Sequence, residues 1–401
     1  MDWANRALNH ARLLTSATPG RGSATRLEAQ AAEYVRKHLA GIGLANLHVQ
    51  PFTGSRSIWF FLALAFGVAI MGHIAFALLP VAIGRWPAWG VSTLLFGASF
   101  LFLFQKFTFR SPPFEDLLPS GPSQNVVAVI PPVGETHRKI VLVSHLDSHR
   151  AVIWFATDLL VSLYGLISPI VIFGSLAAPI LYALLILTGL GVFGWLGVAL
   201  AFLQFLAWFT GVTADLGVYS PGANDNAAAV GTVLALAERL QHAPLQNTEV
   251  TCLFTGCEES GCDGLRTFLR EKGSDYRQAL FVDFELVGIG ERLIYLQAEG
   301  IIRRRRVAPA VERLVAGVPE QEISPWSWGR TAGFTETGAA WEYGFQGVCL
   351  MMLRAGSNLL PEWHRMSDTP DKLSRQALQK THAYAWALMQ TYDAQGLEAT
   401  G

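Results

Sequence analysis

Two long apolar blocks interrupt a chain whose other segments alternate between polar and apolar positions. Residues 58–80 and 87–104 form the first block and carry no formal charge, apart from the titratable His73. Each stretch is close to the ~20 residues that a helix needs to cross the hydrocarbon core of a bilayer. We therefore expect a transmembrane helical hairpin over residues 57–107, turning at the GRWP sequence that contains Arg85.

The second block, residues 152–212, is almost wholly apolar and would be long enough for three spans. If the segments on both sides of it build one site, the block must cross the membrane an even number of times. We therefore expect two crossings within residues 151–214, through long or broken helices or with one segment lying in the interface. Pro169 and Pro179 are places where a helix could break. Asp158, in the first turns, is expected near the interface rather than within the bundle.

Outside these blocks the pattern is typical of an α/β domain. Residues 26–44 place their apolar side chains on one helical face. Strand-like and helix-like runs then alternate, with strands expected at 45–52, 125–132, 139–145, 248–256, 279–288 and 347–353, and helices at 227–240 and 262–273. The soluble domain is therefore expected to comprise residues 1–56, 108–150 and 215–401.

Composition agrees with a membrane protein. Of 401 residues only 15% are charged and 51% are hydrophobic, and the mean hydropathy is +0.32. A formal net charge of −1 gives no reason to expect a nucleic-acid partner. The four cysteines lack CxxC spacing, so neither a zinc ribbon nor a disulfide framework is indicated. The N-terminal sequence lacks the apolar region of a cleaved signal peptide.

Candidate chemistry begins at the end of a predicted strand, in VLVSHLDSHR. His145 and Asp147 point to the same side there, because side chains alternate along a strand. A histidine held by a neighbouring carboxylate is common in metal sites, although HxD alone is more often a chance pair. Asp225, in SPGANDN before a helix, is explained equally well as a helix N-cap or as a ligand.

Two further strands end in carboxylates. Glu258 and Glu259 diverge as adjacent side chains, so one could bind a metal while the other faces a water; a solvated turn is the simpler alternative. Asp283 and Glu285 share one face of a buried strand, where charges need a partner or a metal. His364 precedes SDTPD in a loop, where a lone histidine is usually a surface residue.

Taken in order, the clusters supply two histidines and several carboxylates, which suits two zinc ions sharing a bridging carboxylate. The succession HLD, GANDN, EE, DFELVG and HRMSDTPD resembles the di-zinc aminopeptidase family. That family includes leucyl aminopeptidases, glutamate carboxypeptidases and membrane-bound endoplasmic-reticulum and vacuolar metallopeptidases. The resemblance extends to PGRGSATRLEAQAAEYVRKHLAGIGL and NVVAVIPP, so it covers nearly all of the chain outside the apolar blocks. It implies an α/β fold with a mixed sheet sandwiched by helices, interrupted by the two membrane hairpins.

The resemblance also implies a role for each matched residue. Glu258 would be the general base, taking a proton from a metal-bridging water and passing it to the leaving amine. Asp147 would orient a ligand histidine. Many relatives have aspartate where Glu285 stands, and Asp283 is the alternative ligand. The implied metal ligands are Asp225, bridging both zinc ions, with His145 and Glu285 on one ion and Glu259 and His364 on the other.

Other residues have open roles. Glu336 lies near the position where relatives carry a serine–aspartate pair. It is expected either to contact a metal ligand without binding the metal itself or to lie at the surface. The run Arg303–Arg306 is typical of a solvated or lipid-headgroup-facing patch. A substrate pocket, or packing at the membrane interface, is expected for Trp326, Trp328, Arg330 and Trp341.

The sequence thus predicts a multi-pass membrane zinc exopeptidase, an aminopeptidase whose substrates are peptides, hydrophobic ones if the bilayer is near. A carboxypeptidase or amide hydrolase on the same site is the alternative enzyme. A catalytically silent scaffold is disfavoured by the retained EE pair, and two hairpins make a poor transporter core. No sequence feature indicates an oligomeric state.

Flanking charges predict the orientation in the membrane. Arg85 is nearly the only basic residue on the side opposite the enzyme domain. The positive-inside rule therefore places the catalytic domain in the cytoplasm, since the short flanks on its side carry Arg56, Lys106, Arg110, His149 and Arg150.

Overall fold

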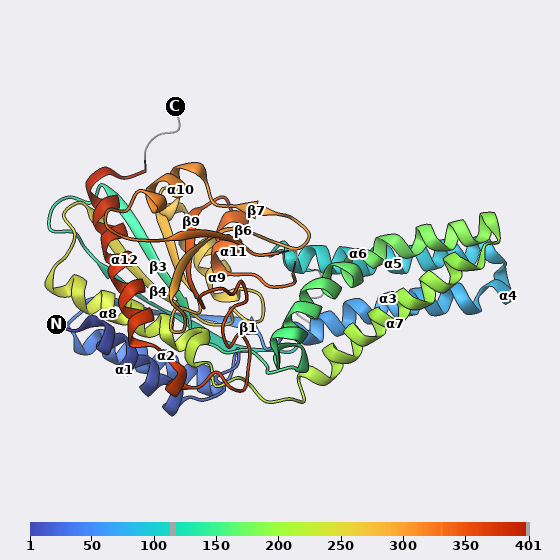
Figure 1. The fold of residues 1–401 in the computed structure, drawn as a ribbon, viewed down its shortest axis with the longest axis horizontal. Helices are drawn as coiled ribbons and strands as arrows, with labels where there is room; N and C mark the ends of the chain where they lie inside the picture. The colour runs from blue at the N-terminus through green and yellow to red at the C-terminus, as the bar shows by residue number, and fades with distance from the viewer. Residues whose placement is uncertain (113–117, 330, 398–401) are drawn as a thin grey trace.

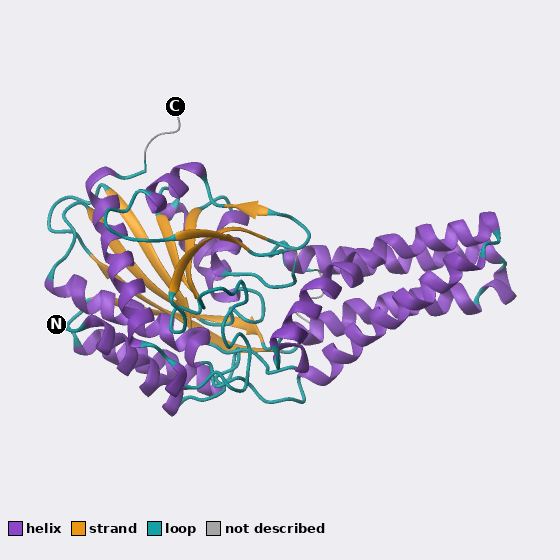
Figure 2. Ribbon diagram, viewed as in Figure 1, coloured by secondary structure: helices purple, strands orange, loops and turns teal. Residues whose placement is uncertain are grey.

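A mixed sheet lies at one end of the molecule, and four long helices project from it at the other (Figures 1 and 2). The computed structural model describes residues 1–112, 118–329 and 331–397. Arg330, one of the expected pocket residues, lies outside these ranges. The predicted fold class, an α/β domain with two helical hairpins, is confirmed.

In the described residues the sheet has nine strands, in the order β1-β2-β4-β3-β5-β9-β6-β7, with β8 paired to β6. Its centre, β4-β3-β5-β9, is parallel, as is the pair β6–β8, whereas the pairs β1–β2, β2–β4, β9–β6 and β6–β7 are antiparallel. The strands are β1 (Asn46–Ser55), β2 (Ser120–Ile130), β3 (Arg138–His145), β4 (Thr248–Thr255), β5 (Leu280–Phe284), β6 (Arg292–Glu299), β7 (Arg305–Arg306), β8 (Ser324–Ser327) and β9 (Gln346–Leu353). Parallel strands bring their carboxyl ends to one edge, and this edge faces the projecting helices (Figure 1).

Helices cover both faces of the sheet. One face packs against α1 (Trp3–Ala17), α2 (Arg26–Gly41), α8 (Ala228–His242), α10 (Pro309–Ala316) and α12 (Arg375–Gln395), and the other against α9 (Asp263–Lys272) and α11 (Glu336–Glu342). Helices α1 and α8 approach so closely that a Cβ at Gly231 would lie 2.3 Å from the carbonyl oxygen of Ala7. Glycine is therefore required at this crossing.

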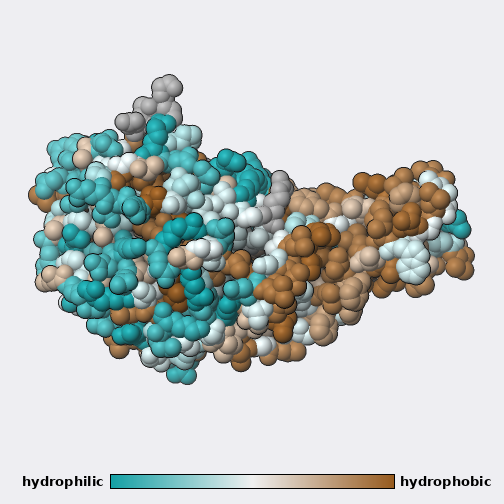
Figure 3. All heavy atoms as spheres, in the orientation of Figure 1, coloured by the Kyte–Doolittle hydropathy of each residue, from teal (hydrophilic) through white to brown (hydrophobic). Residues whose placement is uncertain are grey.

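The four projecting helices have the length and composition of membrane spans. They are α3 (Ile58–Leu78), α5 (Arg85–Phe107), α6 (Asp158–Thr188) and α7 (Gly191–Ala214), with the short α4 (Pro80–Ile83) between the first two. Large apolar side chains cover their outer surface (Figure 3), among them Leu94 and Trp195. Helix α6 continues through Pro169 and Pro179, so of the expected forms the long helix is the one found. Its 31 residues measure about 46 Å at 1.5 Å per residue, more than the ~30 Å hydrocarbon core.

A buried polar network joins the helices at mid-bundle. His73 of α3 contacts the Tyr182 hydroxyl of α6 through Nδ1, and its Nε2 lies 2.9 Å from Oε1 of Gln204 on α7. The Gln204 amide donates to the carbonyl of Val171 at 2.9 Å and to Ser175 Oγ at 3.2 Å. These contacts satisfy polar side chains that would otherwise face an apolar interior.

Candidate metal centre

The candidate residues converge at the carboxyl ends of the central parallel strands. His145 is the last residue of β3, Glu258 and Glu259 follow β4, and Glu285 follows β5. All are buried, together with Asp225 and His364 from two loops. The burial excludes a solvated turn for the two glutamates and a surface position for His364. Asp225 does not cap α8, whose N-terminus has no side-chain cap.

Asp225 lies between the two histidines. Its Oδ1 is 3.4 Å from Nε2 of His145, and its Oδ2 is 3.4 Å from Nε2 of His364. Each histidine has a second carboxylate beside the same nitrogen, Glu285 Oε2 at 3.3 Å from His145 and Glu259 Oε2 at 3.2 Å from His364. The five side chains therefore form two adjoining clusters that share one carboxylate.

The tautomer of His145 follows from its neighbours. Its Nδ1 lies 3.1 Å from the carbonyl oxygen of Asp147 and 3.4 Å from Oδ1 of the same residue. A proton on Nδ1 serves these acceptors and leaves the Nε2 lone pair directed at Asp225 and Glu285. This is the arrangement in which a histidine binds a metal.

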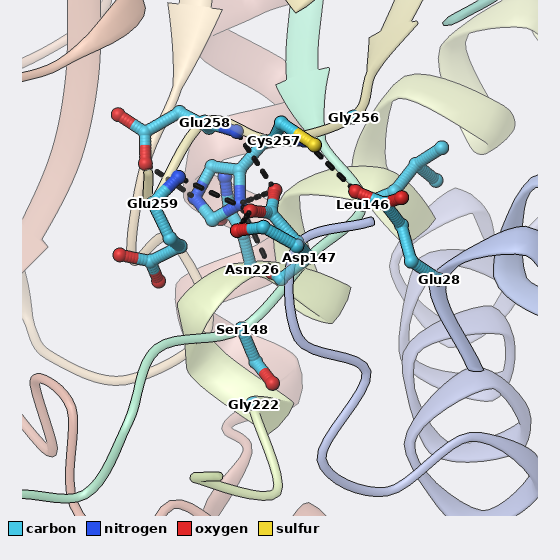
Figure 4. A network of polar contacts seen from close by, with 12 residues as sticks. Glu28, Leu146, Asp147, Ser148, Gly222, Asn226, Gly256, Cys257, Glu258 and Glu259 are labelled. Carbon is cyan, nitrogen blue, oxygen red and sulfur yellow. Dashed lines mark hydrogen bonds and ion pairs between the residues drawn. The ribbon is translucent and has the colours of Figure 1, made fainter. Parts of the chain in front are cut away.

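Asp147 also fixes the Glu258–Glu259 turn. Its two carboxylate oxygens each accept a hydrogen bond of 3.1 Å, from the backbone N–H of Glu258 and of Glu259, and Oδ2 accepts a further one of 2.6 Å from Ser23 Oγ. Figure 4 shows Asp147 between these backbones, and Glu28 beside Cys257, whose N–H donates to it at 2.8 Å. Cys257 is held at φ +56°, a conformation that costs energy in a non-glycine residue.

The loop that carries Asp225 is fixed by residues with no assigned role in the sequence analysis. Asp368, from the SDTPD sequence, accepts the N–H groups of Asn224 at 2.8 Å and Asp225 at 3.0 Å. Arg21 is fully buried and donates to the carbonyls of Leu146 at 2.6 Å and Gly222 at 2.7 Å, so it ties the end of β3 to this loop. Arg21 lies in the quoted PGRGSAT stretch, where no local pattern distinguishes it.

His149 is a further site residue that the sequence analysis missed. Its ring stacks on His364 with a centroid distance of 3.7 Å, and one of its ligand atoms lies close to those of Glu259 and His364. Burial, followed by repulsion from His364, lowers the pKa of His149 to about 4, so it does not count among the flanking charges that set orientation. The alternation of His145, Asp147 and His149 along HLDSH could have identified it.

The electrostatics of the cluster favour bound cations. Burial, then repulsion from Asp225, raises the pKa of Glu259 to about 8. Burial also raises the pKa of Glu258 and Glu285 well above the usual value. Several buried atoms have no hydrogen-bond partner within the described part of the chain, namely Asp225 Oδ2, Glu259 Oε1, Glu285 Oε1 and His364 Nδ1. Nitrogen and carboxylate donors in this number fit zinc, whose charge would relieve the repulsion.

Contacts of Asp283 and Glu336 bear on two alternatives that the sequence left open. Asp283 Oδ2 accepts from the N–H of Thr337 at 3.0 Å and from its hydroxyl at 3.1 Å, whereas Glu285 reaches His145. Glu336 is buried at the start of α11, so a surface position is wrong.

Within the basic run, Arg303 and Arg306 are exposed, as expected of a solvated patch, whereas Arg305 is buried against Glu342 at 2.6 Å. Asp158 sits at the start of α6, as expected, and pairs with Arg365. Of the described tryptophans expected in a pocket, Trp328 lines the cavity beside the cluster, whereas Trp341 donates to the carbonyl of Gly347.

Solved structures share this fold. An aminopeptidase from Aneurinibacillus sp. strain AM-1 matches with 14% identity over 99% of this chain and 95% of that chain, at a TM-score of 0.55. A zinc aminopeptidase from Bacillus subtilis matches with 13% identity over 99% and 96%, at 0.54. A glutaminyl cyclase from an Acidobacteriales bacterium matches with 13% identity over 98% and 96%, at 0.56.

No curated protein sequence matches the chain. Residues 209–389, which hold Asp225, both glutamates of the EE pair, Glu285 and His364, match peptidase family M28. The sequence motifs, the sheet topology and this match agree, and the chain contains a peptidase family M28 domain.

Proposed function

We propose that the protein is a membrane-bound zinc aminopeptidase that removes N-terminal residues from peptides. The observation that carries this proposal is the position of Asp225, with one carboxylate oxygen facing each histidine at 3.4 Å. A shared carboxylate between two nitrogen donors suits a pair of zinc ions. His145 and Glu285 would hold one ion, Glu259 and His364 the other.

Glu258 is placed to move the proton. Its Oε1 accepts from the Cys262 thiol at 3.5 Å, and its Oε2 lies 3.9 Å from Nε2 of His145, at the cavity. Bound zinc would polarise the scissile carbonyl and make the attacking water more acidic. Glu258 takes the proton of that water and delivers it to the departing amine, and a raised pKa suits it to both transfers.

Asp147 is a positioning residue. It holds the Nδ1 proton of His145 and the backbone of the Glu258–Glu259 turn at once. Its burial without solvent contact keeps these groups in a single arrangement. Such partners behind the ligands contribute to metal affinity and activity.

The four apolar helices support residence in a membrane, with two hairpins crossing it and the catalytic domain on one side. Arg56, Arg110 and Arg150 flank the helices on that side, against Arg85 at the far end. We place the catalytic domain in the cytoplasm on this distribution.

The test is hydrolysis of matched peptides by purified wild-type protein and Glu258→Gln. The set comprises N-free, N-acetylated and N-terminal-glutamine peptides. Stepwise release from N-free peptides alone, lost in Glu258→Gln, supports an aminopeptidase. Release from the carboxyl end of acetylated peptides would indicate a carboxypeptidase. Ammonia release with cyclisation of the glutamine peptide would indicate the activity named for the cyclase neighbours.

A further inference from the structure

A second, apolar cavity lies among the membrane helices beside the catalytic pocket. We call it the bundle chamber. Its wall includes Leu62 and Phe66 of α3, Ile167 and Val171 of α6, and Leu203 and Ala207 of α7. The indole N–H of Trp154, at its rim, is satisfied by Thr210 Oγ1 at 3.0 Å. The chamber therefore presents a mainly hydrocarbon surface.

The bundle chamber adjoins the catalytic pocket, and the two cavities share part of their walls. Both cavities are lined by Trp59, Leu62, Tyr164 and Ala332. The Trp59 ring meets His149 edge-on with centroids 5.5 Å apart, and His149 stacks on His364. One α3 side chain thus forms the boundary between the candidate metal centre and the chamber.

The chamber extends into the bundle. Its wall runs along α3 from Trp59 to Phe66 and along α6 from Tyr164 to Ile172, and at its inner end reaches Leu203 of α7. At a helical rise of 1.5 Å per residue, the wall extends roughly 10 Å along α3 between Trp59 and Phe66, which suits an extended chain of several carbon atoms. A group that fills the chamber lies between helices of membrane length and has to be apolar.

Two buried polar atoms on the wall lack a hydrogen-bond partner among the described residues, Trp59 Nε1 and Ser168 Oγ. Trp59 lines both cavities, so its unpartnered N–H belongs to the wall that a substrate reaching from one cavity into the other would contact. Ser168 lies about one helical turn beyond Tyr164 on α6, deeper in the chamber than the wall shared with the catalytic pocket. It is therefore not placed to bind the same part of a substrate.

We propose that the bundle chamber binds a linear alkyl chain of the substrate, carried by the residue on the acyl side of the scissile bond. This inference rests on the proposed peptidase function and adds a substrate class to it: amides whose reacting residue bears a long hydrocarbon chain. The apolar wall, the wall shared with the catalytic pocket at Trp59 and the depth together favour an extended chain over a short or charged side chain.

The test uses full-length protein in lipid nanodiscs and a series of aminoacyl-coumarin amides with methyl, butyl, hexyl and octyl side chains. The expected result is that kcat/KM rises with chain length through octyl, by up to about fourfold per methylene, the value for burying one CH₂ group. Ala207→Phe, which fills the chamber, lowers the octyl-to-methyl ratio at least tenfold. Ala199→Phe, at an exposed position of the same helix, leaves the ratio unchanged.

A second measurement does not depend on turnover. An octyl substrate with a terminal diazirine is photolysed with Glu258→Gln protein, and cross-linked residues are mapped by mass spectrometry. Labels on chamber residues of α6 and α7 that disappear in Ala207→Phe, but persist in Ala199→Phe, support the chamber. If kcat/KM does not depend on the length of the alkyl chain, this inference is overturned while the proposed peptidase function stands. Chamber labelling without any turnover defeats the peptidase proposal instead.

Discussion

The carboxylate of Asp147 accepts the backbone N–H of Glu258 at 3.1 Å. Because Asp147 also lies beside Nδ1 of His145, one buried side chain sets both a candidate ligand and the candidate base. The H-x-D and E-E motifs, more than one hundred residues apart in sequence, are thus one structural unit. Loss of Asp147 would disturb both parts.

We predict that Asp147→Asn lowers zinc affinity and kcat/KM by about 10–100-fold, the range seen when a partner behind a metal ligand is removed. The amide keeps the size of the carboxylate but loses its charge and one acceptor. Zinc titration and peptide hydrolysis measure the two effects. Asp275→Asn, at an exposed position away from the cluster, is the matched control, and equal behaviour of the two variants would contradict the assignment.

Substitution of the two adjacent glutamates is predicted to have different effects on zinc content and on kcat. Glu258→Gln should retain zinc and lose about 10²–10⁴-fold in kcat, the contribution of a general base. Glu259→Gln removes a carboxylate beside His364 and should lower zinc content. Metal analysis beside initial rates separates them, and loss of zinc in both variants would refute the division of roles.

Close packing of α3 and α7 predicts a stability effect at Gly211. A Cβ there would lie 2.8 Å from the backbone N of Ala63 and 2.9 Å from the carbonyl oxygen of Trp59. Gly211→Ala should therefore destabilise the protein by about 1–3 kcal/mol, as overpacking does. Gly97→Ala, which meets open space, should not. Thermal unfolding in the same nanodiscs compares them, and identical midpoints would show that the helices do not pack as described.

The pH dependence of stability is predicted to involve Glu238, far from the metal centre. Although burial opposes it, hydrogen bonds from His10, His38 and Arg6 hold the pKa of Glu238 far below its usual value. Glu238 therefore contributes fully to the free energy of unfolding above the unfolded-state pKa of about 4.3. That contribution is lost as the pH falls below this value. Burial lowers the pKa of His10, so the folded state also weakens as the pH falls below about 6.5.

Glu238→Gln should accordingly flatten the acid side of the stability curve. Unfolding midpoints between pH 7 and pH 3 measure this, with Glu135→Gln, at an exposed loop position, as the control. A wild-type slope that survives in Glu238→Gln would place the acid sensitivity elsewhere.

Much of the fold could be predicted because its signals are local. Uncharged stretches long enough to span a membrane predicted α3, α5, α6 and α7. The alternation of apolar and polar residues predicted β1, β3, β4, β5 and β9 to within a few residues. His145, Glu258, Glu259 and Glu285 could be identified because each lies at or just after the end of a predicted strand. Asp225 and His364 lie in loops and were identified through the order of the motifs. Proline did not end α6, since a single long helix accommodates Pro169 and Pro179.

What the sequence could not supply were contacts between distant segments. Arg21 binds carbonyl groups of Leu146 and Gly222, and carbonyl acceptors leave no trace in side-chain patterns. His149 was counted as a flanking charge, yet it packs between Trp59 and His364. The Arg303–Arg306 run was expected at the surface, whereas Arg305 is buried by its pairing with Glu342.

The central claim is that Asp225 joins two zinc positions. It is tested most directly by the zinc content per chain of purified wild-type protein and of Asp225→Ala, measured by elemental mass spectrometry after dialysis against metal-free buffer. The account predicts two zinc ions per wild-type chain and a loss of zinc in Asp225→Ala. A wild-type chain that holds no zinc after incubation with it, or a zinc content unaffected by Asp225→Ala, would contradict the account.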